Sequence, residues 1–439
     1  MRRVYIETYG CQMNVADTHV IESMLGREGY CVTDQPGDAD VMLVNTCAVR
    51  ENAEQRVYGR VGELKRFKRP GAVLGVVGCM AQRLGTRLLD QVDHVDIVIG
   101  PDGYRALPEL VARAQDGQRG ADVDFKSWEH YEDVPPTAGT RVGAFVTVQR
   151  GCNYRCTFCI VPMTRGSERS RKLQDVVTEV RLLAETGVTE VTLLGQTVNS
   201  YHDGAHDFAD LLRAVGAVEG IRRVRFTSPH PNDFSDRVIA AMAEVATVCE
   251  HVHLPVQSGS SRVLKRMLRR YTREQFVECV DRLRTAIPGL SLTTDIIVGF
   301  PGETEEDFGE TCSLVRAVDF DDAFTFRYSV REGTPAVRIT HHVSEEVAGA
   351  RLQRLIEVVR DVARRRNVRL VGTTHEVLVE KVARRGGLLQ ARTRNNKVVL
   401  VDGPEEWIGS YRTVRLTGTS GSTFTGAPVA PTRELAVLW

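Results

Sequence analysis

Three cysteines lie close together at Cys152, Cys156 and Cys159, spaced C-x3-C-x2-C within RGCNYRCTFCIVP. Iron–sulfur clusters are held by cysteine thiolates, usually four. One loop with three thiolates accounts for three corners of a [4Fe–4S] cube and leaves the fourth iron open to a ligand that is not protein. An open position of this kind separates catalytic metal sites from structural ones. A zinc site fits poorly, because no nearby His or Cys completes a tetrahedron.

Three further cysteines, Cys11, Cys47 and Cys79, each come directly after an expected strand. Helical stretches separate these strands, and strand–helix alternation predicts a parallel, doubly wound sheet. Ligands bind such sheets at the carboxyl ends of the strands. We therefore expect the three cysteines to meet on one sheet edge as ligands. The expected strands cover residues 3–10, 39–46, 72–78 and 95–100.

The chain has ten cysteines, but no disulfide framework is expected, because we predict a cytoplasmic protein whose thiols stay reduced. The N-terminus lacks the apolar region of a signal peptide. No apolar run approaches the ~20 residues that span a bilayer, so no membrane partner is expected. Four cysteines stand alone and are expected to be small buried side chains: Cys31, Cys249, Cys279 and Cys312.

The expected strands and helices that position these cysteines divide the 439 residues into about three domains, which combine α/β and β structure. We expect an N-terminal domain over 1–117, a polar linker over 118–141, a central domain over 142–370 and a C-terminal domain over 371–439. The central domain has six strand–helix units and predicts a partial (β/α)6 barrel, with chemistry at the carboxyl ends of its strands. Its expected strands cover 142–149, 190–195, 223–228, 251–256, 292–300 and 323–329.

The C-terminal segment combines short alternating strands with positive charge. The whole chain carries 57 Lys and Arg against 57 Asp and Glu, yet residues 349–439 carry 16 against 8. Short strands broken by Gly, Asn and Ser are typical of a small β-barrel, an architecture often used for nucleic acid. An excess of positive charge points to a polyanion, although a solvated basic helix over 346–370 accounts for part of it.

These motifs resemble the radical S-adenosylmethionine (SAM) methylthiotransferases over nearly the whole chain. The resemblance rests on TYGCQMN, NTCAVRENAEQRVYGR and VVGCMAQ in the N-terminal domain. It continues with GCNYRCTFCIVPMTRGSERSR, LLGQTVNSY, HLPVQSGS, TDIIVGFPGET and FRYSVREGTPA in the central domain. The tail, with ARTRNNKVVL, resembles the TRAM RNA-binding module. Within the family, NTCAVREN and CIVPMTRG are most similar to the enzymes that act on N6-isopentenyladenosine beside the tRNA anticodon.

The resemblance implies two [4Fe–4S] clusters, one on Cys152, Cys156 and Cys159 and an auxiliary one on Cys11, Cys47 and Cys79. It implies two SAM molecules per turnover. One methylates a sulfur at the auxiliary cluster, and the other yields the radical that takes hydrogen from adenine C2. The expected partners are the tRNA anticodon stem-loop and an electron donor such as flavodoxin or ferredoxin, and the chain is expected to be a monomer.

SAM requires polar contacts at the strand ends, and Phe158, between the last two cysteines, is a candidate to cover its adenine. The resemblance places its methionine amino group near Gly195, Gln196 and Asn199. For every candidate, a structural hydrogen bond or simple packing is an equally good interpretation. The other candidates are Phe158, Ser228, Gln257, Ser258, Asp295 and Arg327. For RNA, the tail residues expected to contact phosphates are Arg384, Arg385, Arg392, Arg394 and Lys397.

Two alternatives remain open from the sequence. The same chemistry acts in other members of the family on threonylcarbamoyladenosine in tRNA or on an aspartate of a ribosomal protein. A non-catalytic RNA-binding iron–sulfur protein is the alternative from another class, but it has little use for a six-unit barrel with polar strand ends.

Overall fold

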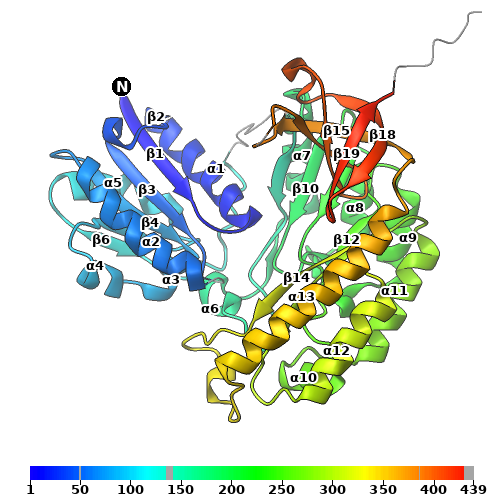
Figure 1. Ribbon diagram of the computed structural model, residues 1–439. Coiled ribbons are helices and arrows are strands. Elements are labelled where there is room, and N and C mark those ends of the chain that lie inside the picture. Colours follow the sequence, from blue (N-terminus) through cyan, green and yellow to red (C-terminus); the bar gives the residue numbers. More distant parts are fainter. Residues whose placement is uncertain (49–50, 135–141, 385, 430–439) are drawn as a thin grey trace, which may run out of the picture.

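The computed structural model describes residues 1–48, 51–134, 142–384 and 386–429. Figure 1 shows three parts in chain order: an N-terminal sheet covered by helices, a central array of strands and helices, and a small C-terminal barrel. Within these residues, no helix is both long and apolar enough to cross a bilayer. The predicted α/β fold class is confirmed.

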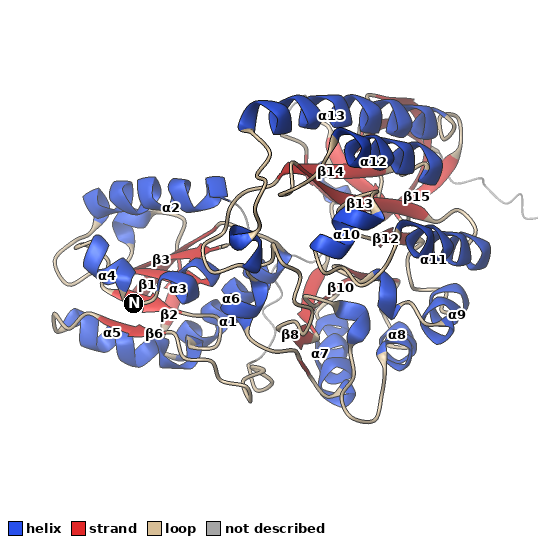
Figure 2. Cartoon of the chain, turned by 90° about the horizontal axis from the view of Figure 1, so that it is seen from below, coloured by secondary structure: helices blue, strands red, loops and turns tan. Residues whose placement is uncertain are grey.

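The N-terminal sheet has six parallel strands in the order β2-β1-β3-β4-β5-β6. Every residue of β3 and β4 is buried, as expected for parallel strands covered on both faces. Helices α1 and α5 pack on one face and α2, α3 and α4 on the other (Figure 2). The strands are β1 (Arg2–Thr8), β2 (Tyr30–Val32), β3 (Val41–Thr46), β4 (Val73–Gly78), β5 (Ile97–Ile99) and β6 (Gly120–Asp122). The helices are α1 (Gln12–Arg27), α2 (Glu51–Leu64), α3 (Cys79–Leu84), α4 (Arg87–Gln91) and α5 (Leu107–Gln115).

The segment 118–141 differs from the predicted linker, because its first half belongs to the N-terminal fold. Residues Gly120–Asp122 form β6, which pairs in parallel with β5. Further on, Glu129 is buried and receives Arg105 in an ion pair, and the buried hydroxyl of Tyr131 donates to the carbonyl of Pro101 at 2.9 Å. The polar composition indicated a linker, but these polar groups are paired with the segment that follows β5. Residues 135–141 lie outside the described part.

The central domain contains the six predicted parallel strands, and one hydrophobic core fills the space between them and their helices. They pair as β11-β10-β7 and β12-β13-β14, and a parallel bridge between Val224 and Val248 links the two groups. The strands are β7 (Ala144–Thr147), β10 (Glu190–Leu194), β11 (Arg223–Phe226), β12 (His251–His253), β13 (Ser291–Val298) and β14 (Asp322–Arg327). The helices are α6 (Val161–Arg165), α7 (Leu173–Glu185), α8 (Phe208–Gly216), α9 (Asp236–Glu244), α10 (Ser261–Arg266), α11 (Arg273–Ala286) and α12 (Glu305–Val318). A short antiparallel pair, β8 (Gln149–Arg150) and β9 (Arg169–Ser170), flanks α6.

The C-terminal part is a closed five-stranded barrel with its own apolar core, reached through the basic helix α13 (Glu345–Val368). Its strand order is β15-β16-β17-β19-β18. The strands are β15 (Thr374–Val382), β16 (Leu389–Thr393), β17 (Val398–Val401), β18 (Tyr411–Thr419) and β19 (Thr423–Pro428). The predicted small β-barrel is therefore present.

The barrel docks on the amino ends of the central strands. Arg223 opens β11 and is fully buried, and its Nη1 donates to the carbonyl of Arg392 at 2.9 Å. Lys397, in the turn after β16, donates its Nζ to Asp321 just before β14 at 2.7 Å. The cysteine loop follows β7 and β8 and so lies at the carboxyl ends of the central strands. The barrel and the cysteines therefore occupy opposite ends of these strands.

Candidate active site between two cysteine triads

Cys11, Cys47 and Cys79, called here the sheet triad, lie at the carboxyl ends of β1, β3 and β4. These strands are neighbours, and the strand order reverses between β1 and β3, where open parallel sheets bind ligands. The backbone at Gly10 runs close to Cys47, since a Cβ added at Gly10 would lie 3.0 Å from the Cys47 Cβ. The three predicted ligands thus share one edge of the sheet.

A buried amide pair ties the first of these strand ends to the second. Asn14 Nδ2 donates to Asn45 Oδ1 at 3.2 Å, and Asn45 Nδ2 donates to the carbonyl of Asn14 at 2.8 Å. The backbone N–H of Cys11 donates to Asn14 Oδ1 at 3.3 Å. Neither Asn14 nor Asn45 was predicted as a site residue, although Asn45 precedes Cys47 by only two residues in NTC.

Cys152, Cys156 and Cys159, called here the loop triad, lie between β8 and α6. Cys152 Sγ is 3.1 Å from Thr197 Oγ1, and Cys156 Sγ accepts from Arg269 Nη1 at 3.4 Å. The backbone N–H of Cys159 donates to the carbonyl of Cys156 at 3.0 Å. These contacts tie the cysteine loop to Thr197 and Arg269 of the central domain.

One thiol in each triad, that of Cys79 and that of Cys159, resists ionisation because burial raises its pKa. Burial raises the pKa of Cys79 to about 11, partly offset by Arg165 and reinforced by the neighbouring Cys47 and Cys11. Burial and Cys156 raise the pKa of Cys159 to about 12. Metal binding deprotonates coordinating thiols outright, so a bound iron at these positions would supply the missing cation.

Two further observations bear on whether the residues fit clusters. Arg165 Nη1 is buried without a hydrogen-bond partner in a side chain that also contacts Cys79, and Gln196 Oε1 is likewise unpaired. In the described part of the chain, no three His, Cys, Asp or Glu side chains converge closely enough for a single ion. In an iron–sulfur cube each thiolate binds a different iron atom, so its ligands need not converge on one point. The six cysteines of the two triads fit two iron–sulfur clusters, each held by three thiolates.

The segments that carry the two triads meet at a contact between α3 and α6, which lie side by side in Figures 1 and 2. Cys79 opens α3, and Ile160 follows Cys159 directly. Ala48, Cys79 and Ile160 form one buried cluster. Arg165, at the end of α6, donates its Nε to Cys79 Sγ at 3.3 Å. The carboxyl edge of the N-terminal sheet therefore abuts the loop that holds the second triad.

A buried carboxylate between two arginines holds this arrangement. Asp17 of α1 is fully buried and accepts from Arg150 Nη1 at 3.1 Å and from Arg165 Nη2 at 2.6 Å. Both arginines belong to the central domain and are nearly fully buried. Nothing in the sequence marked Asp17, Arg150 or Arg165 as site residues, because charged side chains are expected at the surface.

The first group of predicted SAM contacts is mixed. A Cβ at Gly195 would lie 2.8 Å from Gln149 Oε1, so this glycine allows a close approach. Gln196 keeps an unpaired buried oxygen, as a ligand contact requires. Asn199 instead clamps the backbone of His230, donating from Nδ2 at 2.9 Å and accepting at Oδ1 at 2.7 Å. This pairing agrees with the structural interpretation of Asn199.

Three predicted contacts lie after β11 and β12. Ser228 and Gln257 both have left-handed backbone, with φ of 59° and 71°, which non-glycine residues adopt rarely and mostly at sites under constraint. Ser258 is buried, and its Oγ lies 3.4 Å from Thr311 Oγ1. Ser258 is therefore engaged within the protein, whereas the strained positions of the other two remain candidates.

The remaining contacts were predicted at later strand ends and within the cysteine loop. Asp295 Oδ2 is 3.3 Å from His253 Nε2, and Arg327 is half-exposed, 3.9 Å from Glu345. Phe158 packs against the small apolar cluster that contains Phe300. These three stay predictions.

Two of the predicted RNA contacts are used inside the protein. Lys397 is 6% exposed, and its Nζ is bonded to Asp321. Arg394 contacts Glu250 at 2.8 Å and also donates to the carbonyl of Val248. Their positive charge suggested phosphate binding, but acidic groups of the central domain neutralise it, so this assignment is corrected.

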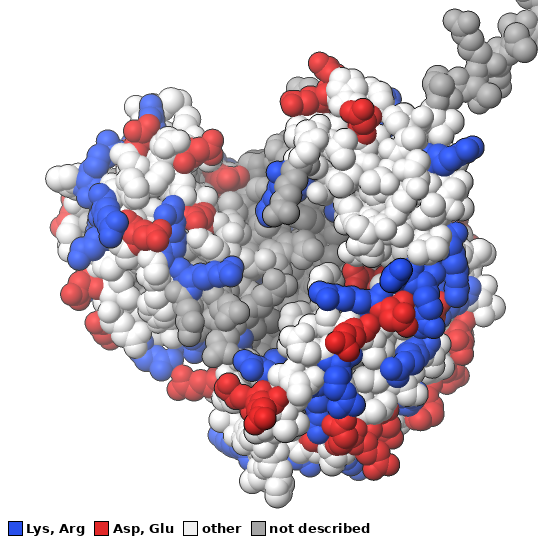
Figure 3. Space-filling model, in the orientation of Figure 1, with Lys and Arg blue, Asp and Glu red and all other residues white. Residues whose placement is uncertain are grey.

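The other three tail residues differ among themselves. Arg392 forms an ion pair with Glu380, and its Nη2 donates to the same carboxylate at 3.2 Å. Arg384 is exposed, and Arg385 lies outside the described residues. On the face in Figure 3, Lys and Arg side chains gather over α13, interspersed with acidic ones. The positive charge of the tail is therefore largely that of a solvated, ion-paired helix.

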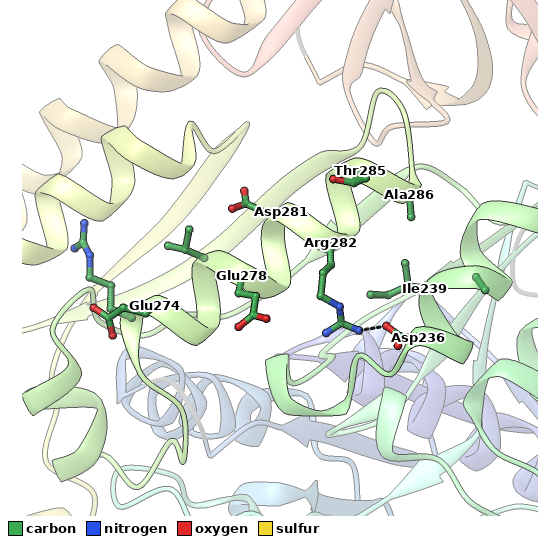
Figure 4. A pocket seen from close by; sticks show the side chains of 11 residues that line it. Asp236, Ile239, Glu274, Glu278, Asp281, Arg282, Thr285 and Ala286 are labelled. Atoms are coloured by element: carbon green, nitrogen blue, oxygen red, sulfur yellow. Dashed lines mark hydrogen bonds and ion pairs between the residues drawn. The ribbon is translucent and has the colours of Figure 1, made fainter.

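A cavity of about 810 Å³ lies away from the cysteines. It is an open groove between α9 and α11 on the outer helical layer, where Figure 4 shows Arg282 paired with Asp236 and acidic side chains along α11. None of its lining residues is a cysteine or a predicted ligand.

Of the four lone cysteines, Cys249, Cys279 and Cys312 are buried as predicted, whereas Cys31 is exposed because β2 is an edge strand.

Comparison with known proteins matches three families along the chain. Residues 3–100 match the uncharacterized protein family UPF0004, residues 146–315 the radical SAM superfamily and residues 368–426 the TRAM domain. Proteins named tRNA-2-methylthio-N(6)-dimethylallyladenosine synthase are similar over nearly the full length. The one from Geobacter sulfurreducens is 47% identical over 94% of both chains. The one from Porphyromonas gingivalis strain ATCC 33277 is 45% identical over 99% of this chain and 96% of its own.

Solved structures share the fold at low identity. The radical SAM methyltransferase TsrM from Kitasatospora setae, with cobalamin and a [4Fe–4S] cluster bound, superposes with a TM-score of 0.59 at 17% identity, over 76% of this chain and 77% of its own. The cobalamin-dependent SAM radical enzyme OxsB with aqua-cobalamin bound gives 0.54 at 12% identity, over 81% and 56%.

Proposed function

The chain belongs to the radical SAM methylthiotransferase family, and we propose that it is a tRNA-2-methylthio-N6-dimethylallyladenosine synthase. It would transfer a methylthio group to adenine C2 of N6-isopentenyladenosine next to the anticodon. The observation that carries the proposal is the pairing of two three-cysteine sets across the α3–α6 contact, in a chain whose full-length relatives bear that name.

The radical SAM family implies a [4Fe–4S] cluster and SAM. We propose that the loop triad holds this cluster and that the sheet triad holds a second one. When bound, the clusters and two SAM molecules supply the radical and the methylated sulfur. The protein's own part is placement. Arg165, Asp17 and Arg150 join the N-terminal sheet to the cysteine loop beside Cys79, which would hold the two clusters on either side of the adenine.

Several residues favour SAM binding beside the loop triad. Gln196 has a buried oxygen without a partner near Cys152 and Thr197, a suitable acceptor for an amino group. Gly195 leaves space where a side chain would collide with Gln149. We retain Phe158, Ser228, Gln257, Asp295 and Arg327 as proposed contacts. Asn199 and Ser258 would support the site indirectly. Asn199 holds the backbone of His230, and Ser258 contacts Thr311.

The base requires little distortion of the RNA, because anticodon-loop nucleotides are single-stranded or lightly stacked. The TRAM match supports an RNA partner, with exposed Arg384 as the phosphate contact from the tail. We place the reaction in the cytoplasm with its tRNA substrate. We propose that the monomer receives electrons from a small donor such as flavodoxin or ferredoxin.

The test is mass spectrometry of tRNA nucleosides from a strain that lacks this protein. Isopentenyladenosine without its methylthio group should accumulate, and the chain supplied in trans should restore the modified nucleoside. Normal methylthiolation in the deletion strain would refute the substrate assignment. A deficit in the threonylcarbamoyl nucleoside instead would favour that alternative substrate.

A further inference from the structure

Each cysteine triad is accompanied by one buried arginine that donates a hydrogen bond to one of its sulfurs. Arg269 Nη1 is 3.4 Å from Cys156 Sγ in the loop triad. Arg165 Nε is 3.3 Å from Cys79 Sγ in the sheet triad. The two guanidiniums come from different parts of the central domain, one after α10 and the other at the end of α6.

The half-buried carboxylate of Asp233 lies within electrostatic range, but among the described residues no carboxylate contacts the guanidinium of Arg269 directly. The residue is 6% exposed, and its other nitrogens donate to the Tyr271 hydroxyl at 3.0 Å and the Pro255 carbonyl at 3.0 Å. Across the described residues, no ion pair involves it. Burying a cation without a counter-ion in direct contact is costly, so a negative partner at this position is stabilising. The partner that it contacts is the Cys156 sulfur.

The backbone around Arg269 is held in an unfavourable conformation toward the cysteine loop. Leu268 and Arg270, on either side, have φ of 55° and 58°. Left-handed backbone at non-glycine residues costs energy and persists where the surroundings impose it. The carbonyl of Met267 accepts from the backbone N–H of Thr157, inside the cysteine loop, at 3.1 Å. The strained turn thus fixes the guanidinium against the loop triad.

The sheet triad also meets an excess of positive charge. Arg165 and Arg150 share one carboxylate, Asp17, and Arg165 Nη1 is buried without a partner. Two cations against one buried anion leave one charge that thiolates at Cys79 and its neighbours would balance.

We propose that Arg269 and Arg165 are positioning residues, one for each triad, that make reduction of the bound cluster more favourable. This inference rests on the proposed function, because it presupposes a cluster at each triad. Reduction adds one electron from an external one-electron donor and no proton, and no bond forms or breaks, so the cluster with its thiolates gains one negative charge. A fixed buried cation stabilises the more negative state, which raises the midpoint potential.

The test is a potentiometric titration of the full-length, iron-reconstituted protein, read by electron paramagnetic resonance. To isolate the loop-triad cluster, the parent carries Cys11→Ala, Cys47→Ala and Cys79→Ala. In this parent, Arg269→Gln should lower the midpoint potential by about 59 mV or more, a tenfold change for a one-electron couple. Arg269→Lys keeps the charge and should retain most of the parent potential. Arg270→Gln, at the exposed neighbour, is the matched control and should leave it unchanged.

The reciprocal parent carries alanine at Cys152, Cys156 and Cys159. There, Arg165→Gln should lower the potential of the remaining cluster, and Arg269→Gln should not. A cluster whose potential is the same in Arg269→Gln and its parent, or an equal shift in Arg270→Gln, overturns the inference and leaves the proposed function standing. A parent that binds no cluster at its intact triad overturns both.

Discussion

Asp17 Oδ2 accepts from Arg165 Nη2 at 2.6 Å across the boundary between the N-terminal sheet and the cysteine loop of the central domain. Arg165 also contacts Cys79, so the same guanidinium touches the anchoring carboxylate and a ligand of the sheet triad. The relative placement of the two triads therefore depends on a polar contact that no solvent reaches, since both side chains are at most 4% exposed.

Replacing Asp17 should therefore damage both stability and the site. Asp17→Asn leaves Arg150 and Arg165 buried without a counter-charge, and we expect it to lower the free energy of unfolding by about 3–5 kcal/mol. Urea unfolding of the metal-free chain measures the effect. Asp34→Asn, at an exposed aspartate of the same domain, should change it by about 0.5 kcal/mol or less. Equal stabilities of the two variants would show that the carboxylate does not balance these arginines.

The two triads should fail in different ways. Cys156→Ala removes a proposed ligand of the cluster that cleaves SAM, so 5′-deoxyadenosine formation should be lost. Cys47→Ala should keep SAM cleavage but abolish methylthio transfer, because only the sheet triad loses a ligand. Chromatography of 5′-deoxyadenosine and tRNA nucleoside mass spectrometry measure the two steps. Methylthio transfer that survives in Cys47→Ala would refute the role of the sheet triad.

The cysteines were predictable and their arginine partners were not, for a physical reason. Cys11, Cys47 and Cys79 follow strands that the local pattern marks, and the geometry of a parallel sheet then brings their positions together. The contact of Arg269 with Cys156 joins residues 113 apart, and that of Arg165 with Asp17 joins residues 148 apart. No local period encodes such pairings.

The same distance effect explains the corrected tail. Positive charge in the last segment correctly indicated a basic element, and the alternating strands correctly indicated a barrel. The partners that neutralise Lys397 and Arg394 lie 76 and 144 residues away in the sequence. Counting charges over the C-terminal segment could not reveal that the barrel docks on acidic groups of the central domain.

Stability should fall in mild acid because of His230. Burial, with Arg269 and Arg270 nearby, lowers the pKa of His230 to about 2. In the unfolded chain His230 takes up a proton below the ordinary histidine pKa of about 6.5, whereas in the folded chain it does not. The contribution of the neutral His230 to stability is therefore present above pH 6.5 and is lost as pH falls. At pH 5 the loss is about 2 kcal/mol.

Urea unfolding of the metal-free chain at pH 5 and pH 7 measures this dependence. His230→Asn should shrink the difference between the two pH values by about 2 kcal/mol, whatever its effect on stability at pH 7. His342→Asn, at an exposed histidine, should leave the difference as in the wild type. An unchanged difference in His230→Asn would mean that this imidazole is protonated in the folded chain.

Lys397 and Arg384 should separate barrel docking from RNA binding. Lys397→Met breaks a buried ion pair and should destabilise the chain by about 3 kcal/mol, near the lower end of the usual range because Asp321 keeps Arg366 Nε at 2.9 Å. It should leave the salt dependence of tRNA binding unchanged, since Lys397 is buried and cannot reach a phosphate of the tRNA. Arg384→Met should do the reverse: unaltered stability, and a slope of log affinity against log salt reduced by about 0.7–0.9 for the lost phosphate contact. Thermal unfolding and tRNA binding at several salt concentrations measure both, and a reduced salt slope in Lys397→Met would restore this lysine as a phosphate contact.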